Sequence, residues 1–351
     1  MEYGLIAKRL GHSFSKDIHN KIDNYNYEPT ELDEKAFADF MSKKDFKGIN
    51  VTIPYKCDVI PYLYKTDKAA EKIGAVNTIV NKNGKLYGYN TDFGGMTALI
   101  KRLGLNLQNS KVLILGTGGT SKTAYCVAES LSAREIIKVS RKKSDESVTY
   151  EQAIKNHCDA DYIINTTPCG MYPNCFDMPI DLSAFKKLSG VVDAVFNPLS
   201  TMLVAKAKEL GIKAAGGLYM LVAQAVLAAR IFTGKNYDDM LIDKIYTEIF
   251  SEKRNLVFYG VNDSIKTELL RVFCGKFDMD CIQIGYAHTS EQLMNAAIKN
   301  HTLILCEGKE LSKQEELYFS LNGVIYNASD ISSCDTNILD KIYLSLQKDE
   351  Q

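Results

Sequence analysis

The apolar positions of residues 1 to 92 alternate between short runs and segments with helical spacing. The short runs are YGLIA, GINVTI, AVNTIV and LYGYN, and the helical segment EKAFADFMSKK lies between the first two. Short runs rich in β-branched residues are typical of strands, whereas apolar residues three and four positions apart are typical of helices. The pattern therefore predicts a mixed α/β domain over residues 1 to 92.

A second pattern begins with a helical segment near Phe93. It leads to the apolar run KVLIL, a glycine-rich turn and the helical segment TSKTAYCVAESL. Strand-like and helical segments then alternate through IIKVS, EQAIKNH, DYIINTTP, VVDAVFNP and STMLVAKAKELG. Strands that alternate with helices at this spacing indicate a parallel, doubly wound sheet. We predict an α/β domain of the Rossmann type over residues 93 to 217.

The remaining chain divides into a helical part and a third strand-helix series. After Gly217 a helical stretch carries an apolar stripe that is interrupted by the amide of Gln224. We predict that helices over about residues 218 to 250 complete the first domain. The charged segment SEKRN at 251 to 255 is typical of a linker, and strand-like runs such as NLVFYG and TLILCEG follow it. Residues 253 to 351 are therefore predicted to form a small α/β domain.

Charge and composition exclude several classes of function. The chain has 42 Lys and Arg against 43 Asp and Glu, for a formal net charge of −1. This balance gives no field that would attract nucleic acid or an anionic membrane surface. We expect no export signal, because no basic segment precedes a long apolar run at the N-terminus. The nine cysteines are scattered without a C-x-x-C pair, and the five histidines form no metal-binding cluster. These features predict a cytoplasmic protein with free thiols and no metal site.

The turn GTGGTS follows a strand and opens a helix, which is the setting of a dinucleotide-binding loop. Gly116 permits the tight turn, and Gly118 lets the backbone approach a pyrophosphate. Gly119 and Thr120 open the helix, whose unpaired N–H groups attract an anion, and Ser121 occupies the position of a small packing residue. The alternative is a glycine turn without a ligand. The strand before the loop and the helix after it favour a cofactor site.

The end of the next strand bears on the choice between NAD and NADP. An NAD site places an acidic residue about twenty residues beyond the loop, where it binds the ribose 2′-hydroxyl. Here the strand ends with Ser140, followed by Arg141, Lys142 and Lys143. A guanidinium and two ammonium groups suit a 2′-phosphate, so NADP is favoured over NAD. The alternative is a solvated basic turn.

Polar side chains recur where the strands of the first domain end. Ser13 and Ser15 lie at alternate positions in GHSFS, and Asn50 and Thr52 do so in INVT. Alternate positions of an extended segment share one face, so each pair can bind a carboxylate or a polyhydroxylated ring. Asn77 lies in AVNT. Each has a structural alternative, since serine and asparagine also terminate strands and stabilise turns.

Lys56 and Asp92 complete this polar set. Lys56 ends NVTIPYK, and Asp92 lies in YNTD just before two glycines. Interconversion of a carbonyl and an alcohol by hydride transfer requires a proton donor and acceptor at the oxygen, which a lysine can supply. The alternatives are a solvent-exposed lysine and an aspartate that caps the following helix. Gln224 would need a partner for its amide, and a substrate hydroxyl could be one.

The chain resembles shikimate dehydrogenases over roughly residues 1 to 250. The motifs GHSFS, NVTIPYK, GAVNT, YNTD, LGTGGTSKTA, INTTPCGM, VVDAVFNP and GGLYMLVAQA carry the resemblance. It implies NADP-linked, reversible reduction of 3-dehydroshikimate to shikimate. It also implies the following roles: Lys56 and Asp92 in catalysis; Ser13 and Ser15 at the substrate carboxylate; Asn77, Asp92 and Gln224 at the ring hydroxyls with Thr52 nearby; and Thr166, Gly217 and Met220 at the cofactor.

Three positions depart from the family pattern. Lys16 replaces a proline, and Phe196 replaces a tyrosine whose hydroxyl helps to bind the carboxylate. The stretch at Arg141 lacks the usual Asn-Arg-Thr motif. Loss of the tyrosine hydroxyl could weaken substrate binding by about 1 to 3 kcal/mol. A quinate-type dehydrogenase that uses NAD and a non-catalytic NADP-binding regulator are the alternatives.

The segment FYGVNDSIKTELL resembles the P-loop of shikimate kinases. Lys266 and Thr267 precede a helix, but Asp263 and Ile265 occupy positions where a phosphate loop has glycine. A carboxylate repels phosphate, and a β-branched side chain crowds it. We predict a degenerate, truncated kinase-like domain without ATP chemistry, which serves in packing, in a possible homodimer or in regulation. A bifunctional enzyme and a domain without any role are the alternatives.

Overall fold

The computed structural model describes residues 1–10, 14–171, 177–197 and 199–252 and, beyond them, four strands. The chain divides into two compact units. The first comprises Met1–Thr167, Ser183–Ala194 and Ile212–Thr247, and the second comprises Pro168–Leu182, Val195–Gly211 and Glu248–Gln351. All predicted substrate and cofactor residues except Ser13 belong to described parts of the first unit. Ser13 lies outside the described residues.

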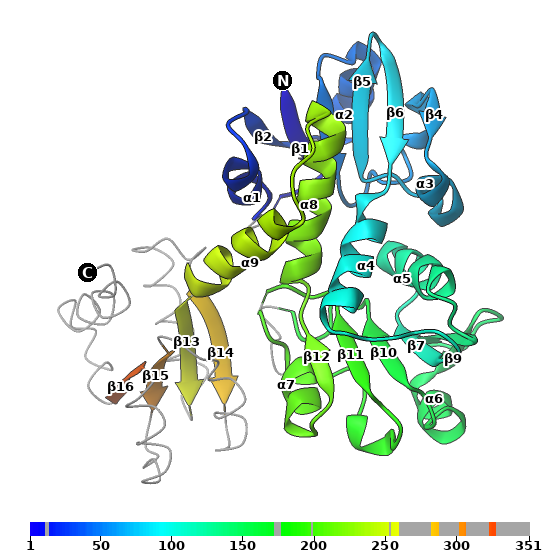
Figure 1. Cartoon of the computed structure of the whole chain (residues 1–351), viewed down its shortest axis with the longest axis vertical. Coiled ribbons are helices and arrows are strands. Elements are labelled where there is room, and N and C mark those ends of the chain that lie inside the picture. Colours follow the sequence, from blue (N-terminus) through cyan, green and yellow to red (C-terminus); the bar gives the residue numbers. More distant parts are fainter. Residues whose placement is uncertain are drawn as a thin grey trace. The chain divides into compact units, whose positions relative to one another are not determined.

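The N-terminal part of the first unit is a mixed six-stranded sheet with the order β2-β1-β3-β5-β6-β4 (Figure 1). β1 pairs in parallel with β2 and β3, whereas β5 pairs in antiparallel fashion with β3 and β6. The strands are β1 (Tyr3–Ala7), β2 (Tyr27–Glu31), β3 (Gly48–Val51), β4 (Lys65–Thr66), β5 (Thr78–Lys82) and β6 (Lys85–Tyr89). The helices are α1 (Ser15–Ile22), α2 (Glu34–Lys43) and α3 (Lys68–Ile73), with a short 3₁₀ turn at Ile60–Tyr62.

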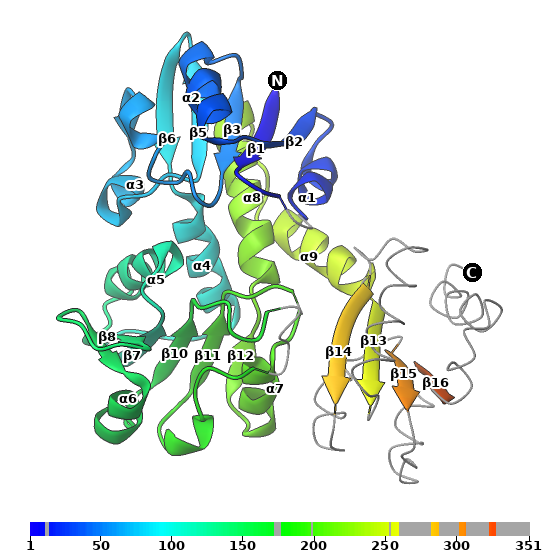
Figure 2. The same cartoon turned by 180° about the vertical axis from the view of Figure 1, so that it is seen from behind.

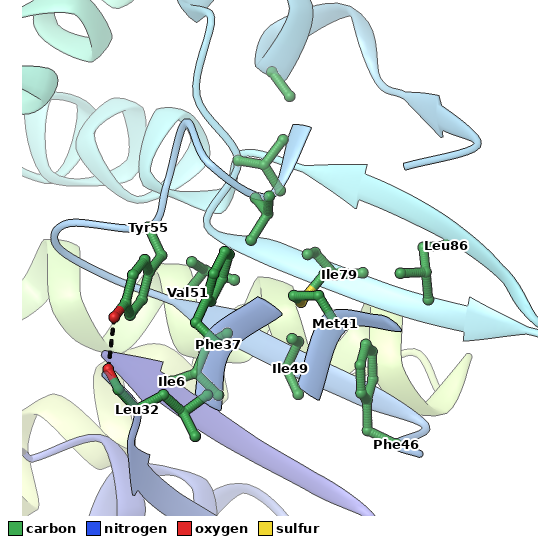
Figure 3. Close-up of a cluster of buried hydrophobic side chains, with 13 residues drawn as sticks. Ile6, Leu32, Phe37, Met41, Phe46, Ile49, Val51, Tyr55, Ile79 and Leu86 are labelled. Atoms are coloured by element: carbon green, nitrogen blue, oxygen red, sulfur yellow. Dashed lines mark hydrogen bonds between the residues drawn. The ribbon is translucent and has the colours of Figure 1, made fainter. Parts of the chain in front are cut away.

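The core on one face of this sheet anchors the segment that carries Lys56. Phe37 and Met41 of α2 pack with buried strand residues such as Ile49 (Figure 3). The ring of Tyr55 stacks on Phe37 with the ring centroids 4.1 Å apart, and its hydroxyl donates to the Leu32 carbonyl at 2.6 Å. A buried aromatic ring with a satisfied hydroxyl is a rigid anchor. The residue before Lys56 is therefore fixed in the core.

A second sheet follows, and all six of its strands are parallel, with the order β12-β11-β10-β7-β8-β9. The strands are β7 (Lys111–Leu115), β8 (Glu135–Ser140), β9 (Ser147–Thr149), β10 (Tyr162–Asn165), β11 (Gly190–Asp193) and β12 (Lys213–Ala215). Counted from β7, this is the 3-2-1-4-5-6 order of dinucleotide-binding folds, and the order reverses between β7 and β10. The predicted α/β fold with a Rossmann-type parallel sheet is confirmed.

Four helices of the first unit accompany these sheets: α4 (Thr91–Arg102), α5 (Gly119–Ser130), α6 (Tyr150–Asn156) and α8 (Leu218–Thr233). Helices α4 and α8 lie side by side, and Figure 2 shows α5 beside α4. A Cβ atom on Gly95 would lie 2.6 Å from the Met220 carbonyl oxygen. Such a distance is too short for any side chain, so glycine permits the close approach of α4 to α8.

Helix α4 begins two residues before the predicted start near Phe93. Asn90 is its N-cap, and the Asn90 side chain accepts a hydrogen bond from the Phe93 N–H at 3.3 Å. An asparagine oxygen satisfies one of the unpaired N–H groups in the first turn of a helix. The first turn therefore contains both Thr91 and Asp92.

The second unit contains α7 (Met202–Glu209) and a parallel sheet with the order β14-β13-β15-β16. Its strands are β13 (Arg254–Tyr259), β14 (Ile282–Ala287), β15 (Thr302–Cys306) and β16 (Gly323–Asn327). The predicted linker at 251 to 255 is shorter than expected, because α9 (Met240–Glu252) extends into it and β13 begins at Arg254. Asp263, Ile265, Lys266 and Thr267 of the P-loop-like segment lie outside the described residues.

Within the described part of the chain, no helix combines the length and apolar character needed to cross a bilayer.

Candidate active site

Lys56, in the turn segment that follows β3, forms an ion pair with Asp92, in the first turn of α4. The Lys56 Nζ lies 2.7 Å from Asp92 Oδ2. The two side chains keep 25% and 18% of their surface exposed, so a ligand can reach the pair. Asp92 lies in the first turn of α4, where the helix dipole stabilises a carboxylate. The alternative that Asp92 caps this helix is wrong, because Asn90 is the cap.

The amides of Asn77 and Gln224 meet at Thr91. Asn77 Oδ1 accepts from the Thr91 N–H at 2.7 Å, and Asn77 Nδ2 donates to Thr91 Oγ1 at 3.0 Å. Thr91 Oγ1 donates to Gln224 Oε1 at 3.4 Å, and Gln224 Nε2 donates to the Leu221 carbonyl at 2.9 Å. The Gln224 amide thus has partners within the protein, and a role for Gln224 at a substrate hydroxyl stays a prediction. The close packing of α4 against α8 supplies Thr91 as one of these partners.

Three members of the two alternating pairs, Asn50, Thr52 and Ser15, lie within the described residues and differ in burial. Asn50 is buried, and its Oδ1 accepts from the Tyr27 hydroxyl at 2.8 Å, whereas Thr52 is half-buried. Ser15 is half-buried as the first residue of α1. Asn50 therefore points into the protein interior and supports the site from behind.

The glycine-rich loop lies at the point where the strand order of the parallel sheet reverses. Gly116 has φ of +107°, and a Cβ atom there would lie 2.8 Å from Thr166 Oγ1. Gly118 is the N-cap of α5, and a Cβ atom on Gly118 or Gly119 would meet nothing within 4 Å. Open space above the free N–H groups of a helix N-terminus fits a pyrophosphate. The residues present therefore fit a dinucleotide.

The other side chains predicted at the cofactor lie around this loop or at the start of α8. Thr120 is half-buried and Ser121 is buried, and the Ser121 hydroxyl has no hydrogen-bond partner within the described chain. Thr166 follows β10 and donates from Oγ1 to the Leu115 carbonyl at 2.6 Å. Gly217 is the N-cap of α8, and Met220 lies in the first turn of that helix. Predicted cofactor residues therefore follow both β10 and β12 of the parallel sheet.

The basic residues after β8 are accessible. Ser140 ends the strand, and its hydroxyl lies 2.9 Å from Ser147 Oγ. Arg141 and Lys142 are exposed, and in the described residues neither forms an ion pair with a carboxylate. Two cations without acidic partners can bind a 2′-phosphate.

Two residues of the site, Thr78 and Thr91, were not singled out from the sequence, nor was the buried His19 of α1. The two threonines follow Asn77 and precede Asp92 directly, so their positions in AVNT and YNTD were a usable signal. His19 is 1% exposed, its ring stacks on Tyr27 with the centroids 3.8 Å apart, and its Nδ1 lies 2.6 Å from the Tyr25 hydroxyl. Burial lowers the pKa of His19 to about 3, and the neighbouring Asn50 side chain opposes this only in part. No spacing in the sequence indicates such a buried, neutral histidine.

Comparison with known proteins assigns the family. The model of the shikimate dehydrogenase substrate binding domain matches residues 5–79. The chain is 38% identical over 271 residues to the shikimate dehydrogenase (NADP(+)) of Clostridium perfringens strain 13, which covers 70% of this chain and 97% of the relative.

Solved structures agree with this assignment. The chorismate mutase/shikimate 5-dehydrogenase fusion protein from Clostridium acetobutylicum has a TM-score of 0.66 at 32% identity, over 71% of this chain and 96% of that one. Shikimate 5-dehydrogenase from Thermus thermophilus in complex with NADP(H) and shikimate has a TM-score of 0.63 at 26% identity, over 71% and 99%. With the Lys56–Asp92 pair and the Rossmann-type sheet in place, the chain belongs to the shikimate dehydrogenase family.

Proposed function

We propose that this protein catalyses the NADP-linked, reversible reduction of 3-dehydroshikimate to shikimate. The observation that carries the proposal is the Lys56–Asp92 pair, which is accessible to a ligand and belongs to the same unit as the dinucleotide loop. The names of its relatives and the ligands in the Thermus thermophilus structure support the same reaction.

Lys56 is the proton-transfer group in this proposal. During alcohol oxidation the neutral amine accepts the proton of the reacting hydroxyl, and during ketone reduction the ammonium returns it. Asp92 accepts a hydrogen bond from Lys56 Nζ and so holds the amine in place. The free oxygen of Asp92 can accept a hydrogen bond from a neighbouring substrate hydroxyl. Ser13 and Ser15 bind the substrate carboxylate, and Thr52, Asn77 and Gln224 contact the ring.

NADP supplies the hydride acceptor and donor when it is bound. The N–H groups at Gly118, Gly119 and Thr120 hold its pyrophosphate. Gly116 and Ser121 shape the loop, whereas Thr166, Gly217 and Met220 line the approach of the cofactor to the substrate. Ser140, Arg141 and Lys142 bind the 2′-phosphate, which favours NADP over NAD.

Three further parts of the sequence-based prediction stay proposals. The C-terminal residues 253 to 351 form a degenerate kinase-like domain without ATP chemistry, since Asp263 and Ile265 replace loop glycines. The protein acts in the cytoplasm. A homodimer is the oligomeric state to test first.

The test follows the absorbance of reduced nicotinamide when the purified full chain meets shikimate and NADP. We expect rapid reduction of NADP by the wild type. Because proton transfer by a side chain contributes about 10²- to 10⁴-fold, Lys56→Ala should lower kcat by a factor in that range. Asp39 pairs with Lys43 on an exposed helix face, so Lys43→Ala is a matched control that should keep full activity.

Other outcomes have defined meanings. Faster turnover of quinate with NAD would replace the proposal with a quinate-type dehydrogenase. No turnover with either substrate or nicotinamide, together with a substrate-induced rise in Tm, would indicate a binding protein. Full activity of Lys56→Ala would remove Lys56 from the mechanism.

A further inference from the structure

A line of hydrogen-bonded side chains runs through the protein interior behind the proposed substrate site. It comprises Asn50, Thr78, Asn77, Thr91 and Gln224, here called the amide chain. These residues come from β3, β5, the start of α4 and α8, together with the residue just before β5. Four segments that are distant in the sequence are thus joined by polar contacts.

Thr78 is the link between the two halves of the amide chain. Its side chain is 0% exposed, so no substrate atom can reach it. Thr78 Oγ1 accepts from Asn50 Nδ2 at 3.0 Å and donates to Asn77 Oδ1 at 3.1 Å. A threonine hydroxyl has one proton, which can go to Asn77 Oδ1 or to Thr91 Oγ1, each 3.1 Å away.

One assignment of the hydroxyl protons directs every donor of the amide chain from Tyr27 toward Gln224. The Tyr27 hydroxyl donates to Asn50 Oδ1, which directs the Asn50 Nδ2 toward Thr78. Asn77 Oδ1 accepts from the Thr91 N–H at 2.7 Å, and the hydroxyls of Thr78 at 3.1 Å and Thr91 at 3.2 Å can each donate to its second lone pair. A flipped amide would place Asn77 Nδ2 2.7 Å from the Thr91 backbone nitrogen, with two donors facing each other.

The same assignment continues to the far end of the chain. Asn77 Nδ2 donates to Thr91 Oγ1, and the Thr91 hydroxyl proton can go to Gln224 Oε1 at 3.4 Å or to Asn77 Oδ1 at 3.2 Å. Gln224 Nε2 donates one proton to the Leu221 carbonyl. Each amide nitrogen carries two protons, so Asn77 and Gln224 each retain one N–H that no described protein group uses.

We propose that Thr78 is a positioning residue that fixes the Asn77 amide with its nitrogen available to the substrate. This inference rests on the proposed function, because it takes the polyhydroxylated ring as the ligand. Asn77 and Gln224 then offer N–H donors to oxygen lone pairs, while Asp92 offers an acceptor to an O–H group. The site is therefore preset for vicinal hydroxyls, each of which can accept and donate.

Thr78→Val tests the proposal, because valine keeps the shape and the β-branch but removes the hydroxyl. We expect the KM for shikimate to rise about tenfold while the KM for NADP changes less than about twofold. Thr78→Ser restores the hydroxyl and should return the KM for shikimate to near the wild-type value. Thr97→Val is the control, because the Thr97 hydroxyl bonds only within its own helix, to the Phe93 carbonyl at 2.8 Å.

A double-mutant cycle with Asn77→Ala separates positioning from general destabilisation. If Thr78 acts through Asn77, its hydroxyl has little left to position once Asn77 is alanine. Adding Thr78→Val to the Asn77→Ala variant should then lower kcat/KM for shikimate by less than about twofold. A full tenfold loss in that background would overturn the proposal, and so would an unchanged KM for shikimate in Thr78→Val. Wild-type inactivity would instead refute the proposed function.

A second variant covers the case in which Thr78→Val does not fold. Tyr27→Phe removes the hydroxyl that donates to Asn50 and leaves the buried ring in place. We expect the KM for shikimate to rise less than in Thr78→Val, and the KM for NADP to stay unchanged. A folded, active Tyr27→Phe variant with an unchanged KM for shikimate would count against the proposal that the amide chain positions Asn77.

Discussion

The substrate side and the cofactor side of the first unit are built in opposite ways. On the substrate side, the side chains of Asn77 and Gln224 are both hydrogen-bonded to Thr91. On the cofactor side, Gly118 and Gly119 present backbone beneath open space, and Arg141 is exposed. The substrate side consists of hydrogen-bonded side chains, whereas the cofactor side consists of a helix N-terminus with basic side chains nearby.

The two sides therefore select their ligands by different physical criteria. A small ring with several hydroxyls is distinguished by the direction of individual hydrogen bonds, so its site needs side chains held in one orientation. A pyrophosphate is recognised by its charge and by close backbone approach, so its site needs space and N–H groups. Substitutions on the two sides should therefore affect different kinetic constants.

The largest effect should come from filling the open space on the cofactor side. Gly118→Val places a branched side chain where a pyrophosphate would lie, and it meets no protein atom within 4 Å at Cβ. We expect the KM for NADP to rise about 100-fold or more, with Tm nearly unchanged, because the loop requires close backbone approach. Steady-state kinetics and thermal unfolding measure both quantities. An unchanged KM for NADP would place the dinucleotide elsewhere.

The next effect concerns His19, the buried histidine of α1 whose ring stacks on Tyr27. The pKa of His19 is lowered from 6.5 to about 3 in the folded protein, so the unfolded chain binds more protons between these values. Stability is therefore complete above about pH 6.5 and falls as the pH decreases toward 3, by about 1.4 kcal/mol for each pH unit.

Urea unfolding of His19→Gln at pH 7.5 and 5.5 checks this expectation. The variant should be less stable than the wild type at pH 7.5, and the difference should narrow by about 1.4 kcal/mol at pH 5.5. Equal pH dependence in the two proteins would show that His19 does not control acid stability.

The smallest effect should come from the exposed cation of the cofactor side. Arg141→Gln removes a guanidinium that has no acidic partner among the described residues. We expect kcat/KM for NADP to fall about tenfold and that for NAD to stay within about twofold, because only NADP carries the 2′-phosphate. Equal losses with both cofactors would assign Arg141 a different role.

The sequence predicted the cofactor loop better than the substrate side. The run KVLIL is β7, and α5 begins at Gly119 directly after the glycine turn. Strand, loop and helix are local here, so the pattern contains the information. The family itself was also predicted correctly.

The burial of Asn50 and the partners of Gln224 could not be predicted in this way. Asn50 lies in the same short run as Thr52, but its partners Tyr27 and Thr78 come from other strands. The Gln224 amide has a partner in α4 only because Gly95 allows that helix to approach α8. Such contacts depend on tertiary packing, which periodicity does not encode.

The close packing at Gly95 has a thermodynamic consequence. Met220 and Gln224 lie four residues apart on α8, which is about 6 Å along the helix axis. The first residue is proposed for the cofactor and the second for the substrate, and α4 with Asp92 is packed against the same helix. Any ligand that displaces α8 from one side changes the fit of the other ligand. By linkage the influence is reciprocal, so each ligand alters the affinity for the other by the same factor.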